Sequence, residues 1–396
     1  MAPETVATDA LTPDMPSLPT PCLLLDETRM AANIARFNRR LARQGLLSRP
    51  HLKTCKSMAV AQRMLHSPTG PATVSTLAEA EYFAAHGVTD ICYAVGLAPG
   101  KLDRVLALRR TGADLSVVLD AARTVTLLDM AAASLVGADD APVPVLLEVD
   151  CDGHRGGLSP EDDELLATAR AVQASPFFQL RGVLTHAGGA YARADTAHIA
   201  RLAREEGEAV LRAARRLREA DFDCPVISVG STPTALLGEY PQGVTEVRAG
   251  VYPFMDLTMH ALGVCALADL ALSVLTTVIG HRRSDGALLV DAGWMALSLD
   301  RGLEERFPQW GFGLVCTADG TLLPGFRVSE CHQEHGVIRA LAPDGTPDPR
   351  ACAQFSPGSR LRILPNHACA TASRHDVCHV LRQGRITACW ERMRGW

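Results

Sequence analysis

The hydrophobic positions of this chain first follow a helical period and then fall into short apolar runs separated by amphipathic segments. Met30, Ile34, Phe37 and Leu41 share one face of a helix that we predict over 28–43. Short apolar runs that predict buried strands follow at 48–53, 72–76, 90–95, 115–119, 143–149, 180–186, 225–229 and 245–248. Segments with helical spacing separate most of these runs, at 77–86, 101–110, 124–135, 161–174 and 196–219.

Strands that alternate with helices form parallel sheets, and eight such units in about 200–250 residues match the size of a (β/α)8 barrel. We therefore predict an α/β fold with a TIM-type barrel over residues 20–258. The first strand of this region, 20–26, is a candidate to join a second domain instead. Residues 1–19 are rich in Pro, Thr, Ala and Asp and are predicted to be a disordered arm.

The pattern changes after residue 258, where the apolar runs become short and rich in β-forming residues. Turn signals such as Ser284-Asp285-Gly286 and Pro343-Asp344-Gly345 separate them. The sequence therefore predicts a C-terminal all-β domain over 259–396. Its strands are expected at 272–279, 287–290, 325–328, 337–341, 360–364, 377–381 and 385–390.

Composition narrows the class of protein. A net charge of -5 without a long basic run argues against a nucleic-acid partner. The longest apolar run, about 265–280, is interrupted by Asp269 and is too short to cross a membrane. The N-terminus lacks the basic and apolar regions of a signal peptide. Twelve scattered cysteines are typical of reduced thiols, which favours a cytoplasmic location.

In a barrel of this type the active residues lie where the strands end. The first strand ends at Lys53, and a lysine on an inward-pointing strand is costly to leave unpaired. One interpretation is a Schiff-base lysine, whose pKa falls when it is desolvated. The other interpretation is a surface lysine in the first loop, and position alone favours that one.

Polar residues also close the fifth and sixth strands. Glu148, Asp150 and Asp152 precede Arg155 and two glycines, a set that suits either an anionic ligand or a salt-bridged loop. His186 and Tyr191 follow the sixth strand and are candidates to stack on, or bond to, a flat ring. A histidine that is simply buried in the core is the alternative for His186.

The seventh and eighth strands end in loops that suit a phosphate group. Barrels often bind phosphate with the loops after these two strands. Ser231 and Thr232 follow the seventh strand, and Arg248, Gly250 and Val251 follow the eighth. Small residues with free backbone N–H groups, together with hydroxyls, provide donors for phosphate oxygens.

The C-terminal region contains a candidate metal site at Pro365-Asn366-His367-Ala368-Cys369. On an extended segment, His367 and Cys369 would face the same side. Their side chains suit Zn²⁺, with Mn²⁺, Co²⁺ and Mg²⁺ as alternatives. Two ligands leave a metal open to water or substrate. A buried cysteine beside an unrelated histidine is the competing interpretation. Candidates for residues that surround the metal ligands and support them are His332, Glu334, His335 and Asp376.

These motifs resemble the alanine-racemase-like family of pyridoxal-phosphate enzymes, called fold type III, and within it the metal-dependent D-serine dehydratase and D-threonine aldolase branch. The resemblance runs from about residue 20 to the end of the chain. The motifs that carry it are Arg49-Pro50-His51-Leu52-Lys53-Thr54, Val74-Ser75-Thr76-Leu77-Ala78-Glu79-Ala80, Thr185-His186-Ala187-Gly188, Val247-Arg248-Ala249-Gly250, Asp291-Ala292-Gly293-Trp294, Glu334-His335-Gly336 and Pro365-Asn366-His367-Ala368-Cys369.

The resemblance implies a role for each candidate. Lys53 would hold the cofactor as a Schiff base and act as the catalytic base. His367 and Cys369 would hold the divalent metal. The cofactor-binding candidates are Lys53, Thr76, Arg155, His186, Tyr191, Ser231, Thr232, Arg248, Gly250 and Val251. The resemblance also implies a homodimer, with the β-domain covering the mouth of the barrel. Two positions depart from the family pattern: Cys55 stands where histidine is common, and Ala249 where proline is usual.

The reaction implied is the loss of water from a D-3-hydroxy amino acid, such as D-serine or 3-hydroxy-D-aspartate, to give a 2-oxo acid and ammonia. Cleavage to glycine and an aldehyde, as in D-threonine aldolase, is the runner-up. The His-x-Cys pair favours the dehydratase. A protein that binds pyridoxal phosphate without catalysis is the alternative from another class.

Overall fold

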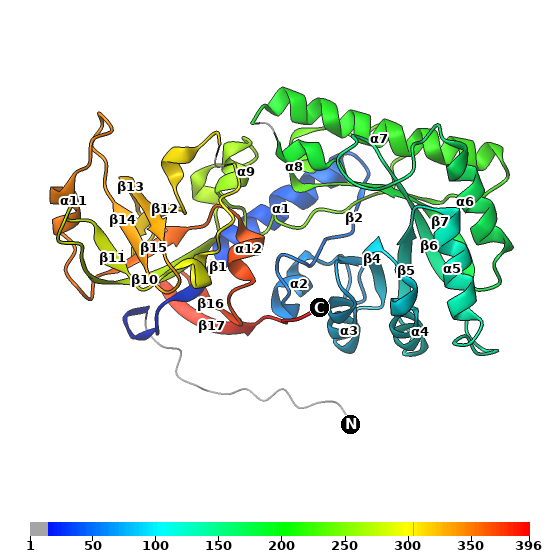
Figure 1. The fold of residues 1–396 in the computed structure, drawn as a ribbon, viewed down its shortest axis with the longest axis horizontal. Coiled ribbons are helices and arrows are strands. Elements are labelled where there is room, and N and C mark those ends of the chain that lie inside the picture. The colour runs from blue at the N-terminus through cyan, green and yellow to red at the C-terminus, as the bar shows by residue number, and fades with distance from the viewer. Residues whose placement is uncertain (1–14, 193, 304) are drawn as a thin grey trace. The chain divides into compact units, whose positions relative to one another are not determined.

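The computed structural model describes residues 15–192, 194–303 and 305–396, and packing divides it into two compact units (Figure 1). One unit contains Arg29–Leu270, His367–Asp376 and Glu391–Trp396. The other contains the described part of Met1–Thr28, together with Ala271–Asn366 and Val377–Trp390. We call them the barrel unit and the β unit.

The barrel unit is built on an eight-stranded parallel sheet with the strand order β2-β9-β8-β7-β6-β5-β4-β3. Its strands are β2 (Leu47–Ser48), β3 (Ala72–Val74), β4 (Asp90–Gly96), β5 (Asp114–Leu119), β6 (Val143–Val149), β7 (Phe178–Thr185), β8 (Val226–Val229) and β9 (Glu246–Val247). The two end strands meet through a parallel bridge between His51 and Thr73. The curled parallel sheet confirms the predicted TIM-type architecture.

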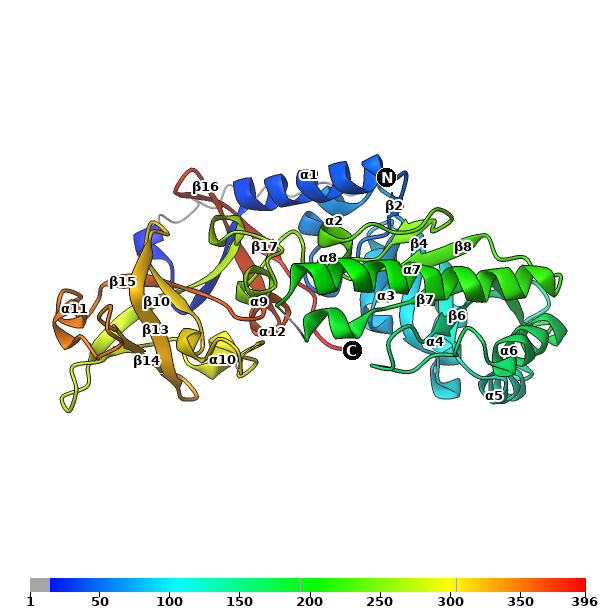
Figure 2. The ribbon, with the colours of Figure 1, turned by 90° about the horizontal axis from the view of Figure 1, so that it is seen from above.

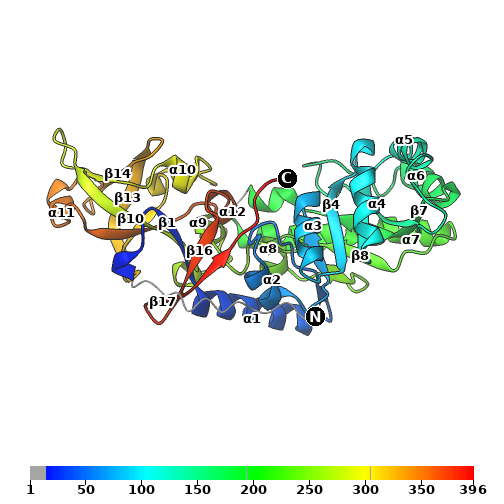
Figure 3. The same cartoon turned by 90° about the horizontal axis from the view of Figure 1, so that it is seen from below.

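Helices form between these strands because their segments carry a buried apolar face, and several of them begin with a side-chain cap. The helices of this unit are α1 (Glu27–Arg43), α2 (Met58–Met64), α3 (Leu77–Ala85), α4 (Leu102–Arg110), α5 (Ala122–Ala132), α6 (Asp163–Ala174), α7 (Thr196–Glu219), α8 (Thr232–Leu237), α9 (Leu257–Ala261) and α12 (Ala368–Ala372). Asp195 caps α7 by accepting the N–H groups of Ala197 and His198. Figures 2 and 3 show α3 to α7 outside the sheet, and consecutive helices pack side by side.

Short 3-10 turns complete this unit, at Pro99–Lys101, Gly188–Tyr191 and Leu267–Asp269. Within the described residues, no helix combines the length and apolar character that a membrane span requires.

The β unit contains a nine-stranded sheet with the order β11-β14-β13-β12-β15-β10-β1-β16-β17. Its strands are β1 (Cys22–Asp26), β10 (Leu272–His281), β11 (Leu288–Val290), β12 (Leu314–Thr317), β13 (Leu322–Cys331), β14 (Gly336–Arg339), β15 (Arg360–Leu364), β16 (Val377–Arg382) and β17 (Arg385–Glu391). Short helices α10 (Trp294–Leu297) and α11 (Pro349–Ala353) and the 3-10 turns Met15–Ser17 and Pro308–Trp310 connect them. Strand β1 pairs antiparallel with β10 and parallel with β16.

The two units interleave along the chain, unlike the contiguous domains 20–258 and 259–396 proposed from the sequence. Residues 22–26 pair inside the β unit, whereas 367–376 and 391–396 group with the barrel unit. The predicted arm, 1–19, lies largely outside the described residues. Leu18, at its described end, is only 1% exposed and packs with Leu24 and Leu275.

Candidate active site

Lys53 lies in the turn that follows the closing bridge of the barrel. The N–H of Leu52 donates to the carbonyl of Thr73 (2.8 Å), and Leu52 is fully buried. Thr54 and Cys55 are buried on the other side, while Lys53 itself is exposed. Burial of its neighbours fixes the backbone at this point and leaves the amine of Lys53 accessible to a ligand.

Two histidines lie within electrostatic reach of Lys53. Burial, together with the charges of Arg155, Lys53 and Arg248, lowers the pKa of His186 to about 3, against a hydrogen bond to Gly230 that acts to raise it. The Nδ1–H group of His186 donates to that carbonyl (2.8 Å), so this nitrogen carries the proton of a neutral ring. Burial also lowers the pKa of His51, a residue to which the sequence assigned no role, and Lys53 adds to that shift.

Arg248 is held in the sheet by a buried polar network. Its guanidinium donates to the hydroxyl of Ser228 (2.5 Å) and to the carbonyl of Thr185 (2.6 Å). Ser228 donates in turn to Glu246 (2.7 Å), which also accepts a hydrogen bond from Arg49 (2.7 Å). The cation at Arg248 is therefore fixed in position by direct partners on β7 and β8, and Ser228 links it to Glu246 on β9.

The loops after β8 and β9 provide several groups that suit an anion. Ser231 caps α8 through a reciprocal hydrogen-bond pair with Thr234. The hydroxyl of Thr232, which is 1% exposed, has no hydrogen-bond partner among the described residues. A Cβ added to Gly250 would lie 2.9 Å from the carbonyl oxygen of His51, so only glycine permits this close approach. Val251 follows it and is buried.

A buried carboxylate joins two of these loops. Glu206 on α7 is 1% exposed and accepts the N–H of Ala187 (3.0 Å) and of Gly230 (2.9 Å). Burial raises the pKa of Glu206, against these hydrogen bonds and the charge of Arg248. One side chain thus holds the backbone beside His186 to the backbone before Ser231. This role could not be predicted from the sequence, because Glu206 lies in a helical segment with many other charged residues.

Tyr191 lies between the ring-binding and phosphate-binding candidates. Its ring centroid is 6.2 Å from that of His186, and its phenol hydrogen bonds to the Ser231 side chain and the Thr232 backbone. Burial raises the pKa of this phenol well above its usual value. Tyr191 is therefore a neutral hydrogen-bonding group beside these residues.

In the described part of the chain, two of the residues predicted to bind the cofactor, Thr76 and Arg155, have no hydrogen bond to His186, Tyr191, Ser231 or Thr232. Thr76 caps α3 by accepting the N–H of Glu79 (3.1 Å), which is a structural use of its hydroxyl. Arg155 is exposed in the loop after β6, although its charge acts on His186. Cys55, where the family often has histidine, is a buried thiol whose pKa is raised by burial to about 11.

The metal pair lies at the start of α12. His367 is extended and stands at the N-cap position of this helix without a side-chain capping hydrogen bond. Cys369 is already inside the helix, so the predicted extended segment ends sooner than expected. Their side chains still approach each other, because Cys369 hydrogen bonds with His367. Burial acts to raise the pKa of Cys369, but His367, a hydrogen bond with Thr54 and the charge of Lys53 together lower it. The Thr54 hydroxyl lies 3.0 Å from the Cys369 sulfur.

The residues predicted to support the metal pair make contacts with other residues. His332 and His335 stack with ring centroids 4.8 Å apart in the β unit. Asp376 pairs with Arg394. Within the described residues, no group of three or more His, Cys, Asp and Glu side chains is arranged to hold a metal. A metal on His367 and Cys369 would therefore need ligands from water or substrate.

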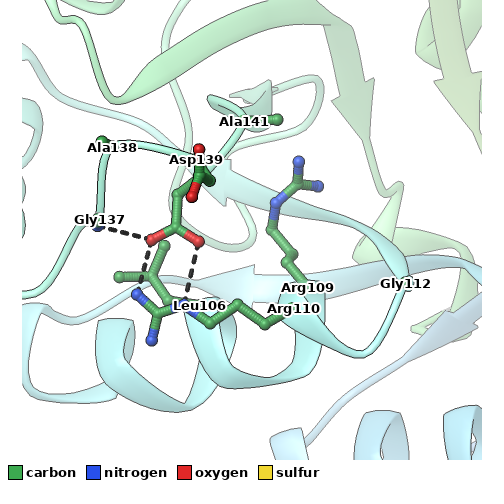
Figure 4. A pocket seen from close by; sticks show the side chains of 9 residues that line it. Leu106, Arg109, Arg110, Gly112, Gly137, Ala138, Asp139 and Ala141 are labelled. Atoms are coloured by element: carbon green, nitrogen blue, oxygen red, sulfur yellow. Dashed lines mark hydrogen bonds and ion pairs between the residues drawn. The ribbon is translucent and has the colours of Figure 1, made fainter.

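A separate pocket of about 660 Å³ lies elsewhere on the barrel unit (Figure 4). It is lined by the end of α4 and by residues 137–141. Its Arg110 pairs with Asp140 (2.6 Å), and its Arg109 donates to the Pro142 carbonyl (3.1 Å). None of the predicted site residues lines this pocket, and its arginines already have protein partners.

Comparison with known proteins matches both parts of the chain. The family model described as "Alanine racemase, N-terminal domain" matches residues 25–258, and the model described as "Putative serine dehydratase domain" matches residues 271–381. A D-threo-3-hydroxyaspartate dehydratase from Delftia sp. (strain HT23) is 44% identical over 96% of this chain and 98% of that protein. The solved structure of that dehydratase has a TM-score of 0.91 and covers 97% of this chain and 100% of its own.

More distant relatives include both reaction types. A D-serine dehydratase from Dictyostelium discoideum is 30% identical, covering 93% of this chain and 94% of that protein. A 3-hydroxy-D-aspartate aldolase from Paracoccus denitrificans (strain Pd 1222) is 27% identical, covering 95% of this chain and 94% of that protein. The matches extend over both units, including the segment with His367 and Cys369.

Proposed function

Because the chain belongs to the family that joins an alanine racemase N-terminal domain to a serine dehydratase domain, we propose that it is a pyridoxal-phosphate- and metal-dependent lyase that dehydrates D-3-hydroxy amino acids. The products would be a 2-oxo acid and ammonia: oxaloacetate from 3-hydroxy-D-aspartate and pyruvate from D-serine. The observation that carries the proposal is that Lys53 lies within electrostatic reach of both His186 and Cys369, in a chain 44% identical to a dehydratase.

The residues around Lys53 fit pyridoxal phosphate. The hydroxyl of Thr232, which has no partner in the described part of the chain, is a buried donor that a phosphate oxygen would satisfy. Gly250 permits the close approach of the turn that contains His51 and Thr54, and we propose that its backbone joins Ser231, Val251 and Thr232 in the phosphate cradle. The remaining residues that we propose to contact the cofactor are Thr76, Arg155, His186, Tyr191 and Arg248.

The donor set at α12 fits a divalent metal. An imidazole and a thiol with a lowered pKa are the ligands that Zn²⁺ favours, because the thiolate is the binding form. We propose Zn²⁺ held by His367 and Cys369, with Mn²⁺, Co²⁺ or Mg²⁺ as alternatives. Thr54 would donate a hydrogen bond to the Cys369 sulfur and orient it.

Pyridoxal phosphate held by these residues would supply an electron-withdrawing ring, and a metal held by His367 and Cys369 would supply a Lewis acid for the β-hydroxyl group of the substrate. The Lys53 amine takes the proton from the substrate Cα as general base. Arg248 is held as a cation by Ser228 and the Thr185 carbonyl, which disfavours a proton on any basic nitrogen beside it. His186 is neutral at pH 7 because its pKa is lowered, so it adds no further positive charge.

Aldolase cleavage remains the second candidate function, because one relative is an aldolase of the same hydroxy amino acid. The dehydratase is preferred on the higher identity of the dehydratase relatives and on the His-x-Cys pair. A homodimer and a cytoplasmic location stay predictions, the second supported by the scattered spacing of the twelve cysteines in the sequence.

The test is a substrate panel on purified protein. Ammonia release is measured with each substrate, in the presence and absence of a metal chelator. The substrates are D-serine, 3-hydroxy-D-aspartate, D-threonine and their L-enantiomers. We expect ammonia only from the D-isomers, with loss of activity in chelator and recovery on adding Zn²⁺. Equal rates with the L-isomers, or rates insensitive to chelator, would argue against the proposal.

A further inference from the structure

The last residues of the chain, Glu391–Trp396, group with the barrel unit, and one of them is a buried arginine. Arg392 is 7% exposed, and its guanidinium donates to several backbone carbonyls. Nε donates to Cys55 (3.0 Å) and Nη2 to Thr54 (3.1 Å). Nη1 donates to His375 (2.9 Å) and to Ala372. Such a planar set of donors holds four carbonyls at fixed relative positions.

These carbonyls belong to two segments that matter for the site. Thr54 and Cys55 follow directly after Lys53. Ala372 is the last residue of α12, the helix that begins directly after His367 and contains Cys369. The final carbonyls of a helix lack partners within the helix, and a cation at that end is favourable. Arg392 thus joins the turn of the lysine to the helix of the metal pair.

The backbone around Arg392 strengthens the same connection. The N–H of Arg392 donates to the carbonyl of Asp376 (2.7 Å), and the N–H of Met393 donates to the carbonyl of Lys56 (2.7 Å). The tail therefore pairs with both segments through its main chain as well. Loss of the guanidinium alone would leave these two hydrogen bonds in place.

Helix α12 has five residues and depends on outside contacts for its position, because so short a helix is not stable by itself. At its N-terminus, the buried carboxylate of Asp256 accepts the N–H of Ala368 (2.8 Å) and that of Met259 (2.8 Å). At its C-terminus it has Arg392. The two ends are thus held by side chains of opposite charge, in the orientation that the helix dipole favours.

We propose that Arg392 is a positioning residue that sets the metal pair, His367 and Cys369, at the place relative to Lys53 that the reaction needs. The inference rests on the proposed function, since it assumes a metal at this pair. The proposal gives the segment Glu391–Trp396 a role in metal binding. Nothing in the sequence of this segment indicates that role, and the segment is far from Lys53 along the chain.

The test compares three variants with the wild-type enzyme loaded with pyridoxal phosphate. Arg392→Met removes the donors, and Arg392→Lys keeps the charge but not the planar fork. Arg394→Met is the matched control, because Arg394 lies in the same tail, is 55% exposed at its side chain, and contacts Asp376 and the Arg374 carbonyl instead. Zn²⁺ affinity is measured by competition with a chromophoric chelator, alongside the visible absorbance of the bound cofactor, the melting temperature, kcat and KM.

We expect Arg392→Met to keep the cofactor absorbance but to bind Zn²⁺ at least tenfold more weakly, with the loss in kcat exceeding the change in KM. Arg392→Lys should recover part of the affinity, and Arg394→Met should match the wild type. Wild-type Zn²⁺ affinity and kcat in Arg392→Met would overturn the inference. So would a parallel fall in melting temperature, cofactor absorbance and metal affinity, which marks a purely structural role.

If Arg392→Met does not fold, Arg392→Lys decides the matter by the same criteria. Failure of the proposed function gives a different result. In that case the wild type turns over no D-3-hydroxy amino acid, whereas the difference in Zn²⁺ affinity between the Arg392 and Arg394 variants still reports on positioning.

Discussion

At the scale of single residues, two lysines three positions apart have different surroundings. Lys53 is exposed between buried neighbours, and its charge acts on His51, His186 and Cys369. The Lys56 amine lies 3.2 Å from the carboxylate of Glu79, whose other oxygen accepts the N–H of Ser75. Lys56 is thus committed to an ion pair, and Lys53 is the lysine available to a cofactor.

This difference predicts the outcome of two alanine substitutions. Lys53→Ala should abolish the visible absorbance of bound pyridoxal phosphate and lower kcat by about 10²–10⁴-fold, because both the covalent attachment and the general base are lost. Lys56→Ala should keep the absorbance. Absorbance spectra and ammonia release measure both effects, and loss of the band in the Lys56 variant alone would reverse the assignment.

His186 predicts a pH dependence of stability. Its pKa falls from 6.5 to about 3 on folding, so the unfolded chain binds more protons below pH 6.5. Its contribution to stability is therefore complete above about pH 6.5 and is lost progressively as the pH falls toward 3. Between pH 7 and pH 5 the loss of stability would be about 2 kcal/mol, at 1.36 kcal/mol per pKa unit.

The measurement is urea unfolding of the apoprotein at several pH values. The free energy of unfolding should depend less steeply on pH in His186→Gln than in the wild type. An unchanged slope would show that His186 is not buried as a neutral group.

At the scale of elements, the loop leading into α8 combines two functions in adjacent residues. Ser231 uses its hydroxyl to cap the helix, whereas Thr232 has a buried hydroxyl without a partner among the described residues. A protein that binds nothing here gains no stability from that hydroxyl, because an unsatisfied buried donor is unfavourable.

Thr232→Val is therefore expected to have opposite effects on the two forms of the protein. The apoprotein should gain about 1 kcal/mol of stability, while affinity for pyridoxal phosphate should fall about tenfold, since a hydrogen bond to a charged phosphate is lost. The control is Thr168→Val on α6, another fully buried hydroxyl without a partner among the described residues. It should stabilise similarly and leave cofactor affinity unchanged. Equal cofactor affinity in both variants would remove Thr232 from the phosphate site.

The elements of the barrel could be predicted because each strand is an apolar run and each helix has a periodic buried face. All eight predicted barrel strands overlap observed ones. Strand β12 (Leu314–Thr317) was missed because its apolar run is only four residues long. Helix α12 was read as extended because five residues are too few to show a helical period. Motifs located the candidate residues, but Glu206, Asp256 and Arg392 act through tertiary contacts that leave no local pattern.

At the scale of the whole molecule, the chain passes between its two units several times. Residues 367–376 and 391–396 belong to the barrel unit, although the strands around them belong to the β unit. Sequence separation therefore does not measure distance from the site. This arrangement explains why family matches to both parts of the chain are needed to account for one set of candidate residues.

The central claim is that these residues remove water from a D-3-hydroxy amino acid rather than cleave its carbon chain. The most direct measurement is the ratio of ammonia to glycine formed from 3-hydroxy-D-aspartate by Zn²⁺-loaded protein. Dehydration predicts ammonia with an equal amount of oxaloacetate and no glycine. Glycine with an equal amount of glyoxylate, and no ammonia, would contradict the claim and show an aldolase.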